Sequence, residues 1–166
     1  LRALATVRAK MPEIRLTMAG TGEMTPHLKR MVCDLGLELN VEFLGLIPHE
    51  RIYALLQEHH IMVMPSREEA FGVAVLESAA CGRPTIASRV GGVSEVLRDG
   101  ETGLLVPPGN AEALAEALIR LLRASEERAT LGRAFQQRAQ AIYSAEPVIQ
   151  QIVRAYERVL SAAGAT

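Results

Sequence analysis

Short apolar segments alternate along this chain with longer segments of helical periodicity, and this alternation constrains its fold most. Residues 61–64 are continuously apolar, as expected of a strand buried on both faces of a parallel sheet. Further strands are predicted at 14–19, 41–44, 85–87 and 103–106. Because helical segments separate the strands, the strands should be parallel and joined by right-handed crossovers. The pattern therefore predicts an α/β fold, a doubly wound parallel sheet with helices on both faces.

The predicted helices carry start and stop signals. Thr25 is predicted to cap a helix that begins at Pro26, and Gly36 to end it. Asn110 and Ser125 are predicted to cap two later helices. We expect residues 1–166 to form a single domain, with a core at 1–142 and a final helix at 143–166.

Composition narrows the class of protein. The chain has 166 residues, 49% of them hydrophobic, which suits one domain with a substantial core. Its net charge is −1, so no basic excess indicates a nucleic-acid partner. No apolar run approaches the ~20 residues of a membrane-spanning helix. Cys33 and Cys81 lack partners at metal-ligand spacing, so we expect both to be buried fillers in a reducing compartment.

The segment from Glu69 to Glu77 carries the strongest functional signal. Seven residues separate the two carboxylates, and between them Phe71 and Gly72 mark a loop that turns into a helix. A glycine at a helix start lets a ligand approach the backbone, and the free N–H groups there favour an anion, above all a phosphate. The carboxylates suit hydroxyl groups, which donate to ionised acceptors. Together these features predict a nucleotide-sugar site.

Three glycine-bearing loops follow predicted strands: 20–22, 71–72 and 91–92. Ligands of doubly wound folds bind beyond the carboxyl ends of strands, so we expect these loops to converge on one edge. The first loop lacks a complete dinucleotide fingerprint, because Thr25 stands where its third glycine belongs. The sequence Gly-x-x-x-x-Gly-Lys-Ser/Thr is absent, which excludes a P-loop.

Glu77 and the histidines differ in how readily a purely structural role explains them. Glu77 lies on a predicted helix that is apolar nearly all round, where an unpaired buried carboxylate is costly. We therefore expect it to cap a backbone group or to await a ligand. His27, His49, His59 and His60 show no ligand spacing, so structural or surface roles are expected and no metal site is predicted.

These motifs resemble the C-terminal, nucleotide-sugar-binding domain of retaining GT-B glycosyltransferases of family 4. That domain has a Rossmann-like fold, and its signature is Glu-x7-Glu with Phe-Gly after the first Glu. The matching segments here are Glu69-Ala70-Phe71-Gly72, Leu76-Glu77, Ala80-Cys81-Gly82-Arg83-Pro84 and Val90-Gly91-Gly92. The resemblance extends over nearly the whole chain.

The resemblance implies a role for each matching residue. Glu69 would lie near the donor sugar as the candidate catalytic residue, and Glu77 would accept hydrogen bonds from the ribose hydroxyls. Backbone N–H groups of Phe71, Gly72 and Val73 would hold the diphosphate. The remaining donor-binding residues implied are Gly20, Gly22, Ile47 near the base, Ala70, Gly91 and Gly92. No metal and no other cofactor are implied.

The resemblance also implies an activity. The parent protein would transfer a sugar from a nucleotide-diphosphate sugar to a glycan, lipid-linked or small-molecule acceptor, with retention of configuration. It would act in polysaccharide or glycoconjugate synthesis, in the cytoplasm or peripherally on the inner face of the membrane. Two alternatives stay open: a GT-B nucleotide-sugar epimerase or phosphorylase-like enzyme, and a non-catalytic nucleotide-binding or assembly module.

One departure from the family pattern concerns the start of the chain. Residues 1–11 correspond to the helix that follows the family's first strand. That strand, its cationic Arg and Lys, and the N-terminal acceptor domain are expected upstream, so the fragment alone is predicted to be inactive. The strand is central in the order 3-2-1-4-5-6, so strands 14–19 and 61–64 should flank a gap. We hypothesise that element exchange, dimerisation or rearrangement closes it. In the family, the last helix crosses onto the N-terminal domain.

Overall fold

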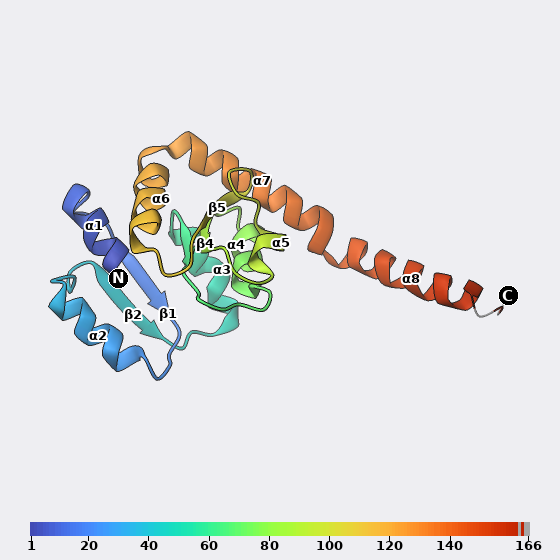
Figure 1. Cartoon of the computed structure of the whole chain (residues 1–166), viewed down its shortest axis with the longest axis horizontal. Helices are drawn as coiled ribbons and strands as arrows, with labels where there is room; N and C mark the ends of the chain where they lie inside the picture. The colour runs from blue at the N-terminus through green and yellow to red at the C-terminus, as the bar shows by residue number, and fades with distance from the viewer. Residues whose placement is uncertain (163, 165–166) are drawn as a thin grey trace.

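Strands and helices alternate through the computed structural model, which describes residues 1–162 and 164 (Figure 1). Each predicted strand is present within two residues of its predicted bounds. The elements in chain order are α1 (Arg2–Lys10), β1 (Leu16–Ala19), α2 (Thr25–Asp34), β2 (Val41–Gly45), α3 (His49–Glu58), β3 (Met62–Met64), α4 (Val73–Ala80), β4 (Thr85–Ser88), α5 (Val93–Val96), β5 (Gly103–Val106), α6 (Ala111–Arg123), α7 (Ser125–Tyr143) and α8 (Ala145–Ala162).

The strands form two parallel sheets. β1 pairs with β2, and β4 lies between β3 and β5, with Ile86 opposite Val63 on one side and Leu104 on the other. Among the described residues, no strand pairs with the free edge of β1 or of β3. The gap expected between these two strands is therefore confirmed. His59, just after α3, spans part of it, with Nε2 2.8 Å from Thr17 Oγ1 and Nδ1 2.7 Å from Leu55 O.

The three-stranded sheet is covered on both faces, as a doubly wound fold requires. Side chains of a strand alternate between the two faces. Ala87 and Leu105 pack with Val75 of α4 and Phe135 of α7. On the other face, residues of β4 and β5 pack with α6 and α7, in a cluster of Ile86, Leu104, Val106, Leu121 and Leu131. The predicted α/β class is confirmed, and the loops at 65–72 and 89–92 follow β3 and β4 of this sheet.

Among the local predictions, one helix cap is confirmed, and two caps and the burial of both cysteines were wrong. Asn110 caps α6 as predicted, with Oδ1 accepting from Ala113 N at 3.0 Å. Thr25 and Ser125 are instead the first residues of their helices and make no capping bond, and Thr25 Oγ1 accepts from Gly22 N at 3.0 Å. Cys33 is exposed, because the buried face of α2 is the one that carries Val32, and Cys81 is half-buried.

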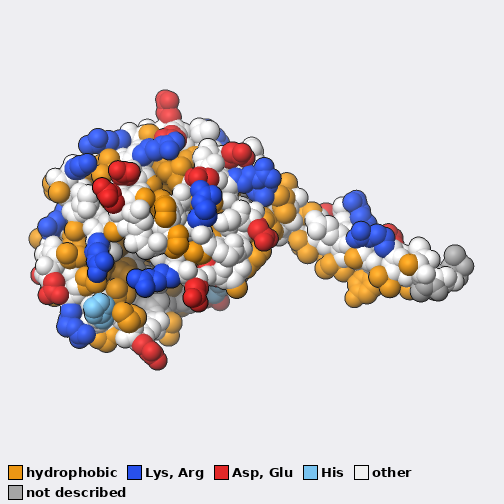
Figure 2. All heavy atoms as spheres, viewed as in Figure 1, with side chains coloured by type: hydrophobic (Ala, Val, Ile, Leu, Met, Phe, Trp, Pro, Cys, Tyr) orange, Lys and Arg blue, Asp and Glu red, His pale blue; other side chains and the backbone are white. Residues whose placement is uncertain are grey.

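α7 packs on the three-stranded sheet, and α8 follows it and projects away from the sheet (Figure 1). One side of α8 is a stripe of exposed apolar residues, visible along its lower edge in Figure 2. The stripe consists of Val148, Ile149, Ile152, Val153, Tyr156, Val159 and Leu160. Among the described residues, no helix combines the length and the apolar character that crossing a bilayer requires.

Candidate functional site

The loop after β3 lies directly against the start of α5. Ala70 O accepts from Gly92 N at 3.1 Å. A Cβ atom on Gly91 would lie 1.9 Å from Glu69 O, and one on Gly92 would lie 2.5 Å from Ala70 O. Only glycine therefore allows the two backbones to approach this closely. The loops after β3 and β4 thus converge as predicted.

Gly72 turns the loop into α4. Its φ of 87° is left-handed, and a Cβ there would lie 3.3 Å from both Met64 Cε and Val93 Cγ2. The helix begins at Val73 rather than at Phe71 as predicted, because this φ cannot continue a right-handed helix. The turn directs two N–H groups to one anionic oxygen: Glu69 Oε1 accepts from Phe71 N at 3.4 Å and from Gly72 N at 3.2 Å.

α7 supports this loop from outside. The Phe71 and Tyr143 rings meet edge to face, with centroids 6.0 Å apart at an interplanar angle of 77°. Tyr143 Oη donates to Glu95 O at 3.4 Å, and Arg138 donates to the same oxygen at 3.1 Å. The end of α7 therefore holds both the Phe71 loop and α5 in place.

Glu77 lies one turn into α4 and faces α3. Its side chain is 25% exposed, and its Oε1 lies 3.4 Å from Nδ1 of His49, the first residue of α3. The expectation that α4 is buried nearly all round was wrong: Val73 is 63% exposed, while the buried face consists of Val75, Ser78 and Ala79. We predicted a structural or surface role for His49. No spacing rule in the sequence joins residues on separate crossover helices, so its contact with Glu77 was not foreseen.

The Gly20–Gly22 loop belongs to the other sheet. Gly20 has a φ of 109° and donates from N to Gly45 O at 2.7 Å, which ties the loop to the end of β2. A Cβ on Gly20 or Gly22 would meet nothing within 4 Å. Among the described residues, no hydrogen bond joins this loop to the Phe71 loop. Ile47 is half-buried in the segment between β2 and α3.

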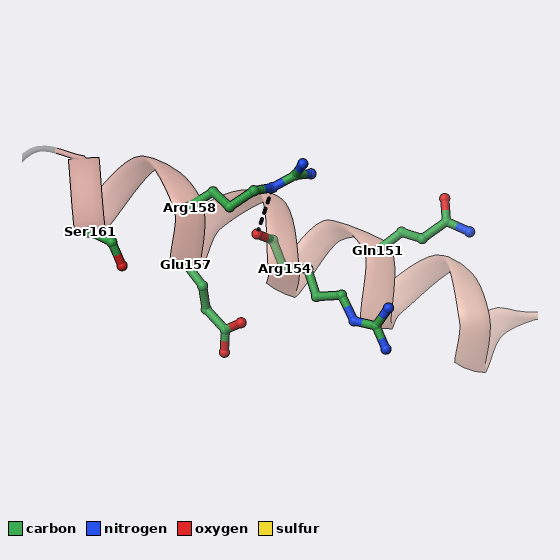
Figure 3. Close-up of a pocket in the computed structure, with 5 residues that line it drawn as sticks. All are labelled: Gln151, Arg154, Glu157, Arg158 and Ser161. Carbon is green, nitrogen blue, oxygen red and sulfur yellow. Dashed lines mark hydrogen bonds between the residues drawn. The ribbon is translucent and has the colours of Figure 1, made fainter.

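The described residues line two hollows that bear on the search for a site. One, of about 130 Å³, lies between α3 and α4 and is lined by His49, Ile52, Tyr53, Leu56, Glu77, Ala80 and Cys81. Burial raises the pKa of the Cys81 thiol, with Glu77 adding to the rise and Arg83 opposing it. The other, of about 780 Å³, follows the polar side of α8. Every residue that lines it belongs to this one helix (Figure 3), so it lacks a second wall and is no enclosed site.

Within residues 1–162 and 164, no group of three or more His, Cys, Asp or Glu side chains is placed to hold a metal ion. The polar features of the candidate site are therefore the backbone N–H groups at the start of α4, the carboxylates of Glu69 and Glu77, and the imidazole of His49.

A parallel α/β domain of this kind is one half of the GT-B fold, and one solved structure that shares the fold is a glycosyltransferase from Rickettsia africae. Residues 1–138 match the family model of glycosyl transferases group 1, and the chain belongs to that family. A curated relative, the D-inositol 3-phosphate glycosyltransferase of Mycolicibacterium paratuberculosis, is 35% identical over 158 residues, which are 92% of this chain and 36% of the relative.

Two solved structures are similar over nearly the whole chain. Sucrose-phosphate synthase from Thermosynechococcus elongatus has a TM-score of 0.84 and 33% identity, covering 97% of this chain and 42% of that one. The Anabaena protein HepE, in complex with UDP and glucose, has a TM-score of 0.85 and 25% identity, covering 94% of this chain and 44% of that one. The chain thus spans about two fifths of the length of these relatives.

Proposed function

We propose that this chain is the donor-binding domain of a retaining glycosyltransferase. The parent protein takes a sugar from a nucleotide-diphosphate sugar and transfers it to a glycan, a lipid-linked or a small-molecule acceptor. One observation carries the proposal: the N–H groups of Phe71 and Gly72 converge on a single anionic oxygen at a helix start. Family membership and the UDP complexes of the Anabaena neighbour support it.

The chemistry assigns each group a task. When the bond between sugar C1 and the diphosphate breaks, negative charge grows on the leaving oxygen. Preorganised N–H donors of Phe71, Gly72 and Val73 stabilise that charge because they need no reorientation as it develops. The acceptor hydroxyl forms the new bond to C1 on the face that the diphosphate leaves, and its proton passes to the leaving phosphate.

The two carboxylates act on opposite sides of the diphosphate. Glu77 accepts hydrogen bonds from the ribose hydroxyls. Glu69 is the candidate catalytic residue and contacts the hydroxyls of the donor sugar. In the structure, its Oε1 accepts hydrogen bonds from the N–H groups that we assign to phosphate. Donor binding therefore requires this carboxylate to rotate away from them. The Glu69 backbone stays fixed, because Gly91 packs against its carbonyl oxygen.

The proposal extends to the rest of the parent protein. Its acceptor-binding half and the cations that complete diphosphate neutralisation lie outside this chain, and no metal is assigned a role. The parent protein acts in polysaccharide or glycoconjugate synthesis in the cytoplasm, including at the inner face of the membrane. We expect no sugar transfer by the 166-residue chain alone. Turnover by the purified chain would contradict that expectation.

Nucleotide binding is the direct test. On the full-length parent protein, a thermal-shift panel of UDP-, GDP- and ADP-sugars should raise the melting temperature with one base, because a ligand at 100 times its Kd stabilises the folded state by about 2.7 kcal/mol. Glu77→Gln should weaken that nucleotide. Glu69→Gln should bind it as well as the unmodified chain or better, and should impair transfer once the acceptor-binding half is present. No shift with any nucleotide would overturn the proposed function.

A further inference from the structure

We propose that Tyr143, the last residue of α7, is a positioning residue for the diphosphate of the nucleotide and that it acts through Phe71. The proposal rests on the proposed function, in which the N–H groups of Phe71, Gly72 and Val73 hold the diphosphate. It adds a side chain that lies outside the Glu69–Glu77 segment and needs no contact with the ligand.

The turn at Phe71 depends on support from outside its own loop. Residues 65–72 join β3 to α4 without regular secondary structure. In the structure, Glu69 Oε1 accepts from Phe71 N at 3.4 Å and from Gly72 N at 3.2 Å. Donor binding in the proposed function moves this carboxylate away, and these two bonds are then lost. The direction of the two N–H groups then depends on contacts with other elements.

α5 supports the backbone of the loop and α7 supports its side chain. Ala70 O accepts from Gly92 N at 3.1 Å, and a Cβ atom on Gly92 would lie 3.1 Å from Phe71 Cα. The Phe71 ring is 40% exposed, and among the described residues the aromatic ring that it meets is that of Tyr143. The centroids are 6.0 Å apart at an interplanar angle of 77°, which is a favourable edge-to-face geometry.

Tyr143 is itself anchored on two sides. Its half-buried side chain packs against the buried cluster under the three-stranded sheet, which includes Val75 and Phe135. Its Oη donates to Glu95 O at 3.4 Å, and Arg138 donates to the same oxygen at 3.1 Å. An anchored Tyr143 ring restricts the positions that the Phe71 ring can take.

Restricting the Phe71 ring also restricts the Phe71 N–H group, because both are attached to one Cα atom. A donor that is already oriented loses less conformational freedom when it binds an anion, so the anion binds more tightly. This effect concerns the phosphates and not the base or the ribose. Tyr143 should therefore contribute to the affinity for UDP and not to the affinity for uridine, which has no phosphate.

Calorimetric titration of the full-length parent protein with UDP, with uridine measured by its displacement of UDP, tests the proposal. UDP is chosen because the Anabaena neighbour is solved with it. GDP with guanosine, or ADP with adenosine, replaces this pair if the thermal-shift panel selects that base. Tyr143→Leu keeps an apolar side chain against the cluster and removes the aromatic contact. It should weaken UDP about 3- to 10-fold, as expected for one lost aromatic pair, and should leave uridine within about twofold.

Tyr143→Phe is the conservative variant. It keeps the ring beside Phe71 and removes only Oη, and Glu95 O still accepts from Arg138. Its UDP affinity should therefore lie within about twofold of that of the unmodified protein.

The matched control is Phe43→Ala, which removes another half-buried aromatic ring from β2 in the other sheet. This change lowers stability but should leave the ratio of UDP affinity to uridine affinity unchanged. A smaller fraction of binding-competent protein weakens both ligands by the same factor, so the ratio separates positioning from loss of fold.

A double-mutant cycle tests whether Tyr143 acts through Phe71. Phe71→Leu should weaken UDP to about the same extent as Tyr143→Leu, because either change removes the same contact. The double variant should weaken UDP no further. A double variant whose loss equals the product of the two separate losses would overturn the route through Phe71.

The outcomes separate the two proposals. If UDP, GDP and ADP all fail to bind the unmodified protein, the proposed function fails and this inference fails with it. If a nucleotide binds and Glu77→Gln weakens it, the proposed function stands. In that case, a Tyr143→Leu variant that keeps full UDP affinity, or that weakens UDP and uridine by the same factor, overturns the role of Tyr143 alone.

Discussion

The two sheets of this domain differ in how completely they are enclosed. Every residue of β4 and β5 is buried, whereas β1 runs from half-buried to exposed. β4 has a strand partner on each side, while β1 has β2 on one side and, among the described strands, none on the other. A parallel strand needs neighbours and helices around it to be buried. The gap borders both sheets, at β1 and at β3, and the loops of the candidate site follow β3 and β4 of the more enclosed sheet.

The glycine loops of the two sheets repeat this contrast. Gly91 and Gly92 lie in backbone contact with the loop at Glu69 and Ala70. Gly20 and Gly22 face open space. A glycine can thus mark either a close contact between two backbone segments or an open position with no neighbour. Sequence alone does not separate the two cases.

Core truncation should separate the two halves most strongly. Phe135→Ala should lower the free energy of unfolding by about 3–5 kcal/mol, because it opens a cavity in the cluster under the three-stranded sheet. Phe43→Ala in β2 should cost about 1–2 kcal/mol, because that ring is half-buried. Urea denaturation measures both. Equal losses would mean that the β1–β2 half is packed as tightly as the other.

A pair of glycine substitutions tests the loops. Gly91→Ala should cost about 2–4 kcal/mol of stability and weaken nucleotide binding, because φ is 43° and the new Cβ would clash with Glu69 O. Gly22→Ala should stay within about 0.5 kcal/mol, because its Cβ would enter open space. Thermal melts with and without nucleotide report both effects. A Gly91→Ala variant as stable as its parent would contradict the close approach of the two loops.

Hydrogen exchange should resolve the strands themselves. Amides of β4 should exchange about tenfold more slowly than those of β1, or slower still, because opening β4 breaks ladders on both of its sides. Exchange followed by mass spectrometry over peptides covering 16–19 and 85–88 provides the comparison. Comparable rates would show that an added strand, from a second copy or an exchanged element, protects the edge of β1 in solution.

Thiol alkylation gives the smallest contrast. Burial raises the pKa of Cys81, so at a given pH below that value its thiolate fraction is lower, and the thiolate is the reactive form. Iodoacetamide at pH 8 should therefore modify the exposed Cys33 several times faster than Cys81. Glu77→Gln should speed Cys81, because the carboxylate contributes to its raised pKa. Peptide mass spectrometry can follow each cysteine, and a faster Cys81 in the unmodified chain would contradict this reading.

Much of the fold could be predicted because its signals are local. Apolar runs such as 61–64 mark strands, and glycines such as Gly36, with a φ of 62°, mark the ends of helices. The cap at Asn110 was found for the same reason, whereas Thr25 and Ser125 failed because a one-residue shift moves a hydroxyl from the cap into the helix. Boundaries of this kind depend on packing that no short window of sequence contains.

The candidate site was predictable where it depends on one segment and not where it depends on two. The start of α4 follows from Gly72 and its neighbours. The contact of Glu77 with His49 joins separate crossover helices, and the contact of Phe71 with Tyr143 joins a loop to a helix that is distant in the sequence. Glu69 was predicted to lie near a donor sugar, and its present bond to its own loop depends on a side-chain rotamer. These relations arise only when the sheet brings distant loops together.

The junction between α7 and α8 has a mechanical consequence. Tyr143, the last residue of α7, touches Phe71 of the candidate site, and Ser144 follows in an extended conformation. Beyond it, α8 has 18 residues, a rod about 27 Å long at 1.5 Å per residue. A rotation of about 10° at Ser144 would carry the far end of that rod through about 5 Å, by the same helix geometry. The pivot of α8 therefore lies beside the loop that carries Phe71.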